Sequence, residues 1–181
     1  MLDGEKEFLI RAIGGEASAF GLLYKHYQPQ IYRFIYFKVG LREEAEDLTH
    51  RVFLNAWNNI EGYQFQGFPF SSWLYRIARN QVVDHYRAAK PNTSSLDNVD
   101  TEIAAPLDDP IAAIEDKNNL TKIKMAISRL KPEYQEIIIM RFVEDMAVKE
   151  VASAMGKSEG AIKILQHRAV KSLKKLINGS R

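Results

Sequence analysis

The stretch from Val148 to Lys171 restricts the possible fold more than any other part of the chain. Its apolar residues recur at the spacings of two short helices, and Gly156 between them can adopt the left-handed backbone that ends the first helix. Ser158 follows with a hydroxyl that can cap the second helix. The small Ala152 allows two crossing helices to approach closely. The sequence therefore predicts two helices joined by a tight turn.

The second of these helices is predicted to present polar side chains to solvent. Ile162 and Leu165 form its inward stripe. The outward residues are Glu159, Lys163, Gln166 and His167, with Arg168 and Lys171 at the flank of the stripe. An exposed row of this kind can lie along the major groove of DNA, as in helix-turn-helix proteins.

A helical hairpin whose charges only keep it soluble has the same spacing, so the distribution of charge decides between the two interpretations. Residues 148–181 hold eight Lys or Arg and two acids, whereas the whole chain holds 25 Lys or Arg and 23 acids. The basic charge is therefore concentrated on the predicted hairpin, which favours DNA binding.

Composition excludes several classes of protein. The 181 residues are 46% apolar and 27% charged, as in globular proteins. No apolar run approaches the roughly 20 residues that cross a bilayer, and the opening MLDGEKEFLI is acidic where a signal peptide is basic, so we expect a cytoplasmic protein without membrane insertion. We expect no metal site, because the chain has no cysteine and its four histidines lie far apart in the sequence. With no phosphate-binding glycine loop or nucleophile motif, we expect no enzyme activity, no cofactor and no small-molecule substrate.

An acidic segment divides the chain. Residues 91–116 hold three prolines, seven acids and no Lys or Arg, which is typical of a linker. We therefore predict an N-terminal domain at 1–90, a flexible acidic linker at 91–114 and a C-terminal domain at 115–181.

Both domains are predicted to be helical, which makes the expected fold class all-α. The expected helices are 5–13, 17–27, 30–39, 42–58, 71–89, 116–130 and 132–142, followed by the two helices of the hairpin. Breaks are expected at Gly14-Gly15, at Gln28-Pro29, at Gly40 and between residues 62 and 69.

A second polar face is predicted within residues 63–87. The buried stripe of the helix there consists of Leu74, Ile77, Ala78 and Val82, whereas another face carries Trp73, Arg76, Asn80, Asp84 and Arg87. The preceding loop holds the rings of Tyr63, Phe65, Phe68 and Phe70. Aromatic and cationic side chains together can stack on unpaired bases and hold a single strand. Most of these rings also fit a hydrophobic core, but burial does not account for the polar face.

Three segments together resemble one protein family over nearly the whole chain. They are AEDLTHRVFLNAW at 45–57, FSSWLYRIARNQVVDHYR at 70–87 and LKPEYQEIIIMRFVEDMAVKEVASAMGKSEGAIK at 130–163. In this order they resemble the extracytoplasmic-function (ECF) sigma factors, the small two-domain promoter-specificity subunits of bacterial RNA polymerase. The resemblance implies binding to core RNA polymerase, recognition of minus-35 and minus-10 promoter elements, and stabilisation of the melted strand.

The first segment is similar to the one that docks on the clamp helices of the polymerase β′ subunit. Helical spacing places Leu41, Ala45, Leu48, Val52 and Ala56 inward. The outward residues, and so the expected polymerase contacts, are Asp47, His50, Arg51 and Leu54. His50 and Arg51 stand where the family commonly has glutamine followed by an acid.

The second and third segments are similar to the family's two DNA-reading regions. The implied minus-10 residues are Tyr63, Phe65, Trp73, Arg76, Asn80, Asp84 and Arg87. Asn80 matches a position that helps to capture a flipped base, and either Tyr63 or Phe65 can be the ring that stacks there. The implied minus-35 residues are Ser158, Glu159, Gly160, Lys163, Ile164, His167, Arg168 and Lys171.

The resemblance also implies partners. These are core RNA polymerase, through its β′ clamp helices and β flap, promoter DNA and an anti-sigma factor. The alternative is a stand-alone helix-turn-helix regulator whose N-terminal helices sense a ligand or dimerise. That alternative gives the face with Trp73, Asn80 and Arg87 no role.

Overall fold

The computed structural model describes residues 2–65, 67–89 and 117–178, and this part of the chain contains helices and no strands. The N-terminal domain comprises α1 (Glu5–Ile13), α2 (Ala17–Val39), α3 (Arg42–Asn59), the short 3₁₀ turn η1 (Ile60–Gly62) and α4 (Phe70–Ala89). The C-terminal domain comprises α5 (Lys117–Ser128), α6 (Pro132–Ile138), the π-helical turn η2 (Ile139–Val143), α7 (Val148–Met155) and α8 (Glu159–Asn178). The all-α prediction is confirmed, and the predicted linker at 91–114 lies outside the described residues.

Helix α2 is the centre of the N-terminal domain. It packs against α1, α3 and α4, and its buried residues Leu23, Tyr27, Ile31 and Ile35 recur every four positions. The predicted break at Gln28-Pro29 was wrong, because α2 continues through Pro29. The proline ring is exposed, and the apolar stripe on the opposite side is buried without interruption, so packing outweighs the lost hydrogen bond. Gly40 ends the helix with a φ of 78°, as its position predicted.

The segment predicted as one helix at 132–142 is α6 followed by η2. Pro132 occupies the first turn of α6, where its missing N–H costs nothing. The four consecutive residues from Ile137 to Met140 are all buried, which exceeds one face of a helix. They are covered because α8 packs on α6 while α2 contacts η2 from the other domain.

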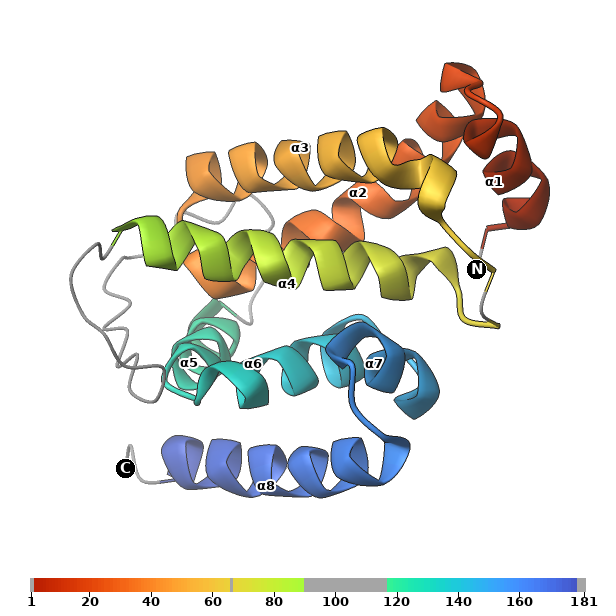
Figure 1. The fold of residues 1–181 in the computed structure, drawn as a ribbon. Coiled ribbons are helices and arrows are strands. Elements are labelled where there is room, and N and C mark those ends of the chain that lie inside the picture. Colours follow the sequence, from red (N-terminus) through yellow and green to blue (C-terminus); the bar gives the residue numbers. More distant parts are fainter. Residues whose placement is uncertain (1, 66, 90–116, 179–181) are drawn as a thin grey trace.

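The two domains pack against each other through α4 and α7, and α2 adds contacts with α5 and η2. Figure 1 shows α4 lying between α3 and the C-terminal helices, with α8 on the far side of that domain. Consequently one side of α4 faces the C-terminal domain, while α8 keeps an open outer face.

Candidate nucleic-acid interface

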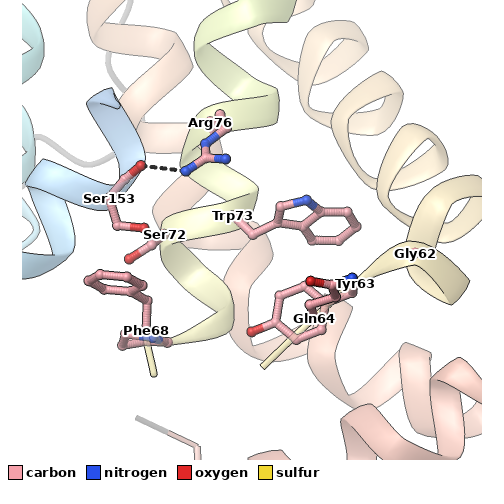
Figure 2. Close-up of a pocket in the computed structure, with 9 residues that line it drawn as sticks. Gly62, Tyr63, Gln64, Phe68, Ser72, Trp73, Arg76 and Ser153 are labelled. Atoms are coloured by element: carbon pink, nitrogen blue, oxygen red, sulfur yellow. Dashed lines mark hydrogen bonds between the residues drawn. The ribbon is translucent and has the colours of Figure 1, made fainter. Parts of the chain in front are cut away.

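A cleft of about 300 Å³ opens at the start of α4, beside the loop that leads into the helix. Figure 2 shows its lining side chains, with the indole of Trp73 beside Tyr63 and the guanidinium of Arg76 near α7. The lining residues are Gly62, Tyr63, Gln64, Phe68, Pro69, Ser72, Trp73, Arg76 and Ser153. The cleft therefore brings together the predicted loop and the predicted helical face.

Aromatic rings form one wall of the cleft. The ring centroids of Tyr63 and Trp73 are 5.2 Å apart at an interplanar angle of 56°, and Phe70 lies 5.4 Å from each of them. Phe65 contacts Tyr63 at 5.4 Å but does not line the cleft, and it is largely exposed. Tyr63 is half-buried, which raises the pKa of its hydroxyl.

Phe70 belongs to the core and cannot stack on a base. It is 0% exposed, which corrects its inclusion among the candidate stacking rings. Its backbone N–H donates to a carboxylate oxygen of Glu5 at 3.2 Å, and the hydroxyl of Tyr27 donates to the other oxygen. Glu5 is buried, and its role was not predictable because a lone acid near the start of a helix has the pattern of a surface residue. Through this carboxylate, α1 fixes the start of α4.

The predicted polar face of α4 is confirmed as exposed beyond Trp73. Arg76, Asn80, Asp84 and Arg87 all face solvent, and Trp73 is half-buried. Arg87 lies 3.6 Å from Asp84 in a weak exposed ion pair. Asn80 is exposed, so its carboxamide is accessible to a base edge along this face.

Helix α7 covers part of this surface. Arg76 donates to the backbone oxygen of Ser153 at 2.7 Å, and Arg79 donates to that of Ala154 at 3.1 Å. Both acceptors belong to the last turn of α7, and the Ser153 carbonyl also accepts the N–H of Gly156 at 3.3 Å. The guanidinium groups of α4 therefore bind the C-terminal end of α7.

Ion pairs complete the contact between the domains. Glu136 of α6 lies 2.8 Å from Arg79 and 3.6 Å from Lys38, and Glu144 lies 2.6 Å from Arg33. Lys38 and Glu136 are both buried, and burial lowers the pKa of Lys38 although Glu136 opposes that shift. Contacts of this kind between distant charges are not predictable from sequence spacing.

The predicted helix-turn-helix is present. Gly156 ends α7 with a φ of 63°, and the Ser158 hydroxyl accepts the N–H of Ala161 at 3.2 Å at the start of α8. Ile162 is fully buried and Leu165 is half-buried, as the stripe predicted. The predicted minus-35 residues are all exposed: Ser158, Glu159, Gly160, Lys163, Ile164, His167, Arg168 and Lys171. Gln166, expected outward, is half-buried because it accepts a hydrogen bond from Arg141.

The outer face of α3 carries the predicted polymerase contacts. Asp47, His50, Arg51 and Leu54 are exposed, and Leu54 is 48% exposed despite its apolar side chain. Arg51 pairs with Asp47 at 2.9 Å, so the unusual cation in this segment is partly neutralised. Leu41 was wrongly placed inward, because it precedes α3 in an extended conformation and is 45% exposed.

Within the described ranges, no three His, Asp or Glu side chains gather as metal ligands would, and no helix has the length and apolar character needed to cross a membrane.

Comparison with known proteins assigns both halves of the chain. The family model Sigma-70 region 2 matches residues 23–91, and the model Sigma-70, region 4 matches residues 120–173. The ECF RNA polymerase sigma factor BldN of Streptomyces coelicolor is 40% identical over 175 residues, which are 94% of this chain and 65% of BldN. The ECF RNA polymerase sigma factor SigW of Bacillus subtilis is 27% identical over 172 residues, which are 89% of this chain and 90% of SigW.

Two solved structures share the fold. CnrH, in complex with the cytosolic domain of CnrY, gives a TM-score of 0.74 at 20% identity and covers 98% of this chain and 99% of that chain. The sigma factor RpoE, in complex with the anti-sigma factor NepR from Bartonella quintana, gives a TM-score of 0.71 at 22% identity. The match covers 90% of this chain and 98% of that chain. A stand-alone helix-turn-helix regulator would not match sigma region 2, so that alternative was wrong. The chain belongs to the ECF family of RNA polymerase sigma factors.

Proposed function

We propose that this protein binds core RNA polymerase and directs it to promoters by reading a minus-35 element and capturing a melted minus-10 strand. The observation that supports this most is the pairing of two different surfaces in one chain. One is the aromatic cleft at the start of α4, and the other is the exposed, cation-bearing face of α8. The first suits unpaired bases and the second suits a duplex groove.

In this proposal the N-terminal domain, 1–90, docks on the β′ clamp helices through Asp47, His50, Arg51 and Leu54. The C-terminal domain, 115–181, contacts the β flap and reads the minus-35 element with the α8 residues named above. The acidic linker, 91–114, follows the basic RNA path of polymerase, because its negative charge is repelled by DNA and attracted to that path. The protein acts in the cytoplasm, and it catalyses no reaction and uses no cofactor.

Strand capture is assigned to Tyr63, Trp73, Arg76, Asn80, Asp84 and Arg87. Tyr63 is favoured over Phe65 as the stacking ring, because Tyr63 lines the cleft beside Trp73 and Phe65 does not. Unstacking a base costs a few kcal/mol, and stacking on a ring returns about 1–3 kcal/mol per base. These terms nearly balance, so contacts with polymerase must favour the open state.

An anti-sigma factor is the proposed regulator. RpoE, which shares the fold, was crystallised with the anti-sigma factor NepR. Copurification from cells tests this partner, and a chain recovered only with polymerase would argue against it.

The central experiment measures transcription by core polymerase with and without the protein, on promoters with altered minus-35 or minus-10 elements. We expect the protein to give selective initiation and Leu54→Asp to abolish it. The substitution replaces an apolar side chain at the proposed polymerase contact with a charged one. Ile10→Asp on α1 is the matched control, because Ile10 is similarly exposed at 55%. Failure of the purified chain to associate with core polymerase would reject the proposed function.

A further inference from the structure

Two buried side-chain oxygens of the described residues have no hydrogen-bond partner, and both belong to α4. They are the hydroxyls of Ser72 and Tyr75. Buried polar groups are nearly always paired, because leaving one unpaired costs free energy. An unpaired hydroxyl beside a binding cleft therefore suggests a partner that the free protein lacks.

Ser72 lines the cleft at the start of α4. It is 1% exposed, precedes Trp73, and stands one helical turn before Arg76. Figure 2 shows its side chain on the side of α4 that faces Phe68 and Ser153, so α7 lies over it in this closed arrangement. Access to the hydroxyl of Ser72 therefore requires the two domains to separate on assembly, which would remove Ser153 as a wall of the cleft.

We propose that Ser72 helps to determine which base the cleft accepts, by hydrogen bonding to the edge of the flipped minus-10 base. This inference rests on the proposed function. Stacking on Tyr63 and Trp73 tolerates any base, because every base has a π-face. Sequence must be read by groups that meet base edges, and a serine hydroxyl both donates and accepts.

The other polar groups of the cleft are less suited to this role. Arg76 is a pure donor with a charge that matches a phosphate, and its guanidinium is bound to the Ser153 carbonyl in the free protein. Gln64 is exposed on the loop and has more rotamers to fix. Ser72 is held by the first turns of α4, whose start is fixed by Glu5.

A purely structural role for Ser72 predicts a different effect of Ser72→Ala than a base-reading role does, so an experiment can separate the two roles. If a small residue is needed only for α7 to approach α4, then Ser72→Ala preserves that approach and changes nothing about base choice. If the hydroxyl reads a base, Ser72→Ala removes an unpaired group from the closed protein and a contact from the open complex. Stability then stays equal or rises while base preference falls.

The test uses holoenzyme assembled from core polymerase and the full chain. Transcript yield is measured on templates carrying each base in turn at each minus-10 position. For Ser72→Ala we expect the preference for the best base at one position to fall about threefold to tenfold, as for loss of one hydrogen bond. Dependence on the minus-35 element should be unchanged, and the melting temperature of the free chain should not fall.

Ser71→Ala is the matched control, because Ser71 is half-buried on the same turn and does not line this cleft. It should leave base preference unchanged. The inference is overturned if Ser72→Ala keeps the parent's base preference, or if it lowers transcript yield equally on all templates. If the parent holoenzyme itself shows no promoter selectivity, the proposed function fails instead.

Discussion

Asn80 is the residue for which sequence and structure agree most directly. Its position on the polar face was expected from spacing, and its side chain is exposed two turns after Ser72. Because Asn80 is exposed, removing the carboxamide should affect binding of the melted strand far more than the fold.

We predict that Asn80→Ala reduces open-complex formation by about tenfold or more, as expected for loss of a side chain that bonds a base. Binding to a minus-35 duplex and the melting temperature should match those of the parent. Permanganate reactivity of the minus-10 thymines is the measurement, and equal reactivity in mutant and parent would reject the role.

Tyr86 makes the free energy of unfolding depend on pH in the alkaline range. Its hydroxyl donates to the backbone oxygen of Lys38 at 2.6 Å, and burial raises its pKa from 10.0 to about 12. The unfolded chain therefore releases this proton first as pH rises. The stabilising contribution is present below pH 10 and is lost as pH rises through about 12.

Tyr86→Phe should accordingly lower stability at neutral pH and make stability less sensitive to pH between about 10 and 12. Denaturant unfolding at several pH values measures this. A variant whose stability falls as steeply as that of the parent over this interval would show that Tyr86 does not carry the effect.

Individual burial was predictable only where a residue sat well inside a regular helix. The outward residues of α3 and α4 were placed correctly because 3.6-residue spacing determines them. Leu41 and Phe70 were misplaced because each lies at a helix boundary, where the backbone direction depends on the neighbouring loop. Ser72 shares the spacing of Arg76 and Asn80, so its face was predictable, but its burial under α7 required knowledge of the domain packing.

At the scale of elements, local signals were reliable when they agreed with packing. The turn at Gly156 and Ser158 formed as predicted, because both a left-handed glycine and a capping hydroxyl mark it. Pro29 gave the opposite outcome, since a strong local signal was overridden by a continuous buried stripe along α2.

Helix α8 yields a prediction of its own. Lys163→Ala or Arg168→Ala should weaken promoter binding, by about 1–3 kcal/mol if the lost contact is to a base edge. Loss of a phosphate contact would instead weaken binding equally on all sequences and reduce the salt dependence of binding.

The matched control is Lys175→Ala, an exposed cation in the last turn of the same helix. Promoter binding and transcription are measured on minus-35 variants for all three mutants. Unchanged base preference in the two test variants would count against α8 as the reading helix.

At the scale of the whole molecule, Glu136 joins the two domains. Its carboxylate pairs with Arg79 of α4 and Lys38 of α2, in a region where all three side chains are largely removed from water. Removing one member of a buried charge group leaves the others unpaired, which typically costs about 3–5 kcal/mol. None of this was visible in the sequence, because contacts between distant charges have no periodic signal.

We predict that Glu136→Gln separates the domains. The radius of gyration from small-angle X-ray scattering should increase, and the melting transition of the free chain should broaden or shift down. Glu133→Gln is the control, because Glu133 forms an exposed pair with Lys157 at 3.1 Å whose loss should cost under about 1 kcal/mol. An unchanged radius with Glu136→Gln would show that other contacts suffice to hold the domains together.

The bond from Arg76 to the Ser153 carbonyl has a consequence for unassembled copies of the protein. While that bond exists, one edge of the guanidinium is occupied, and Ser153 lines the cleft beside the rings. We therefore expect idle copies to ignore the single strands exposed during replication and repair, and to remain available in the cell for the enzyme they serve.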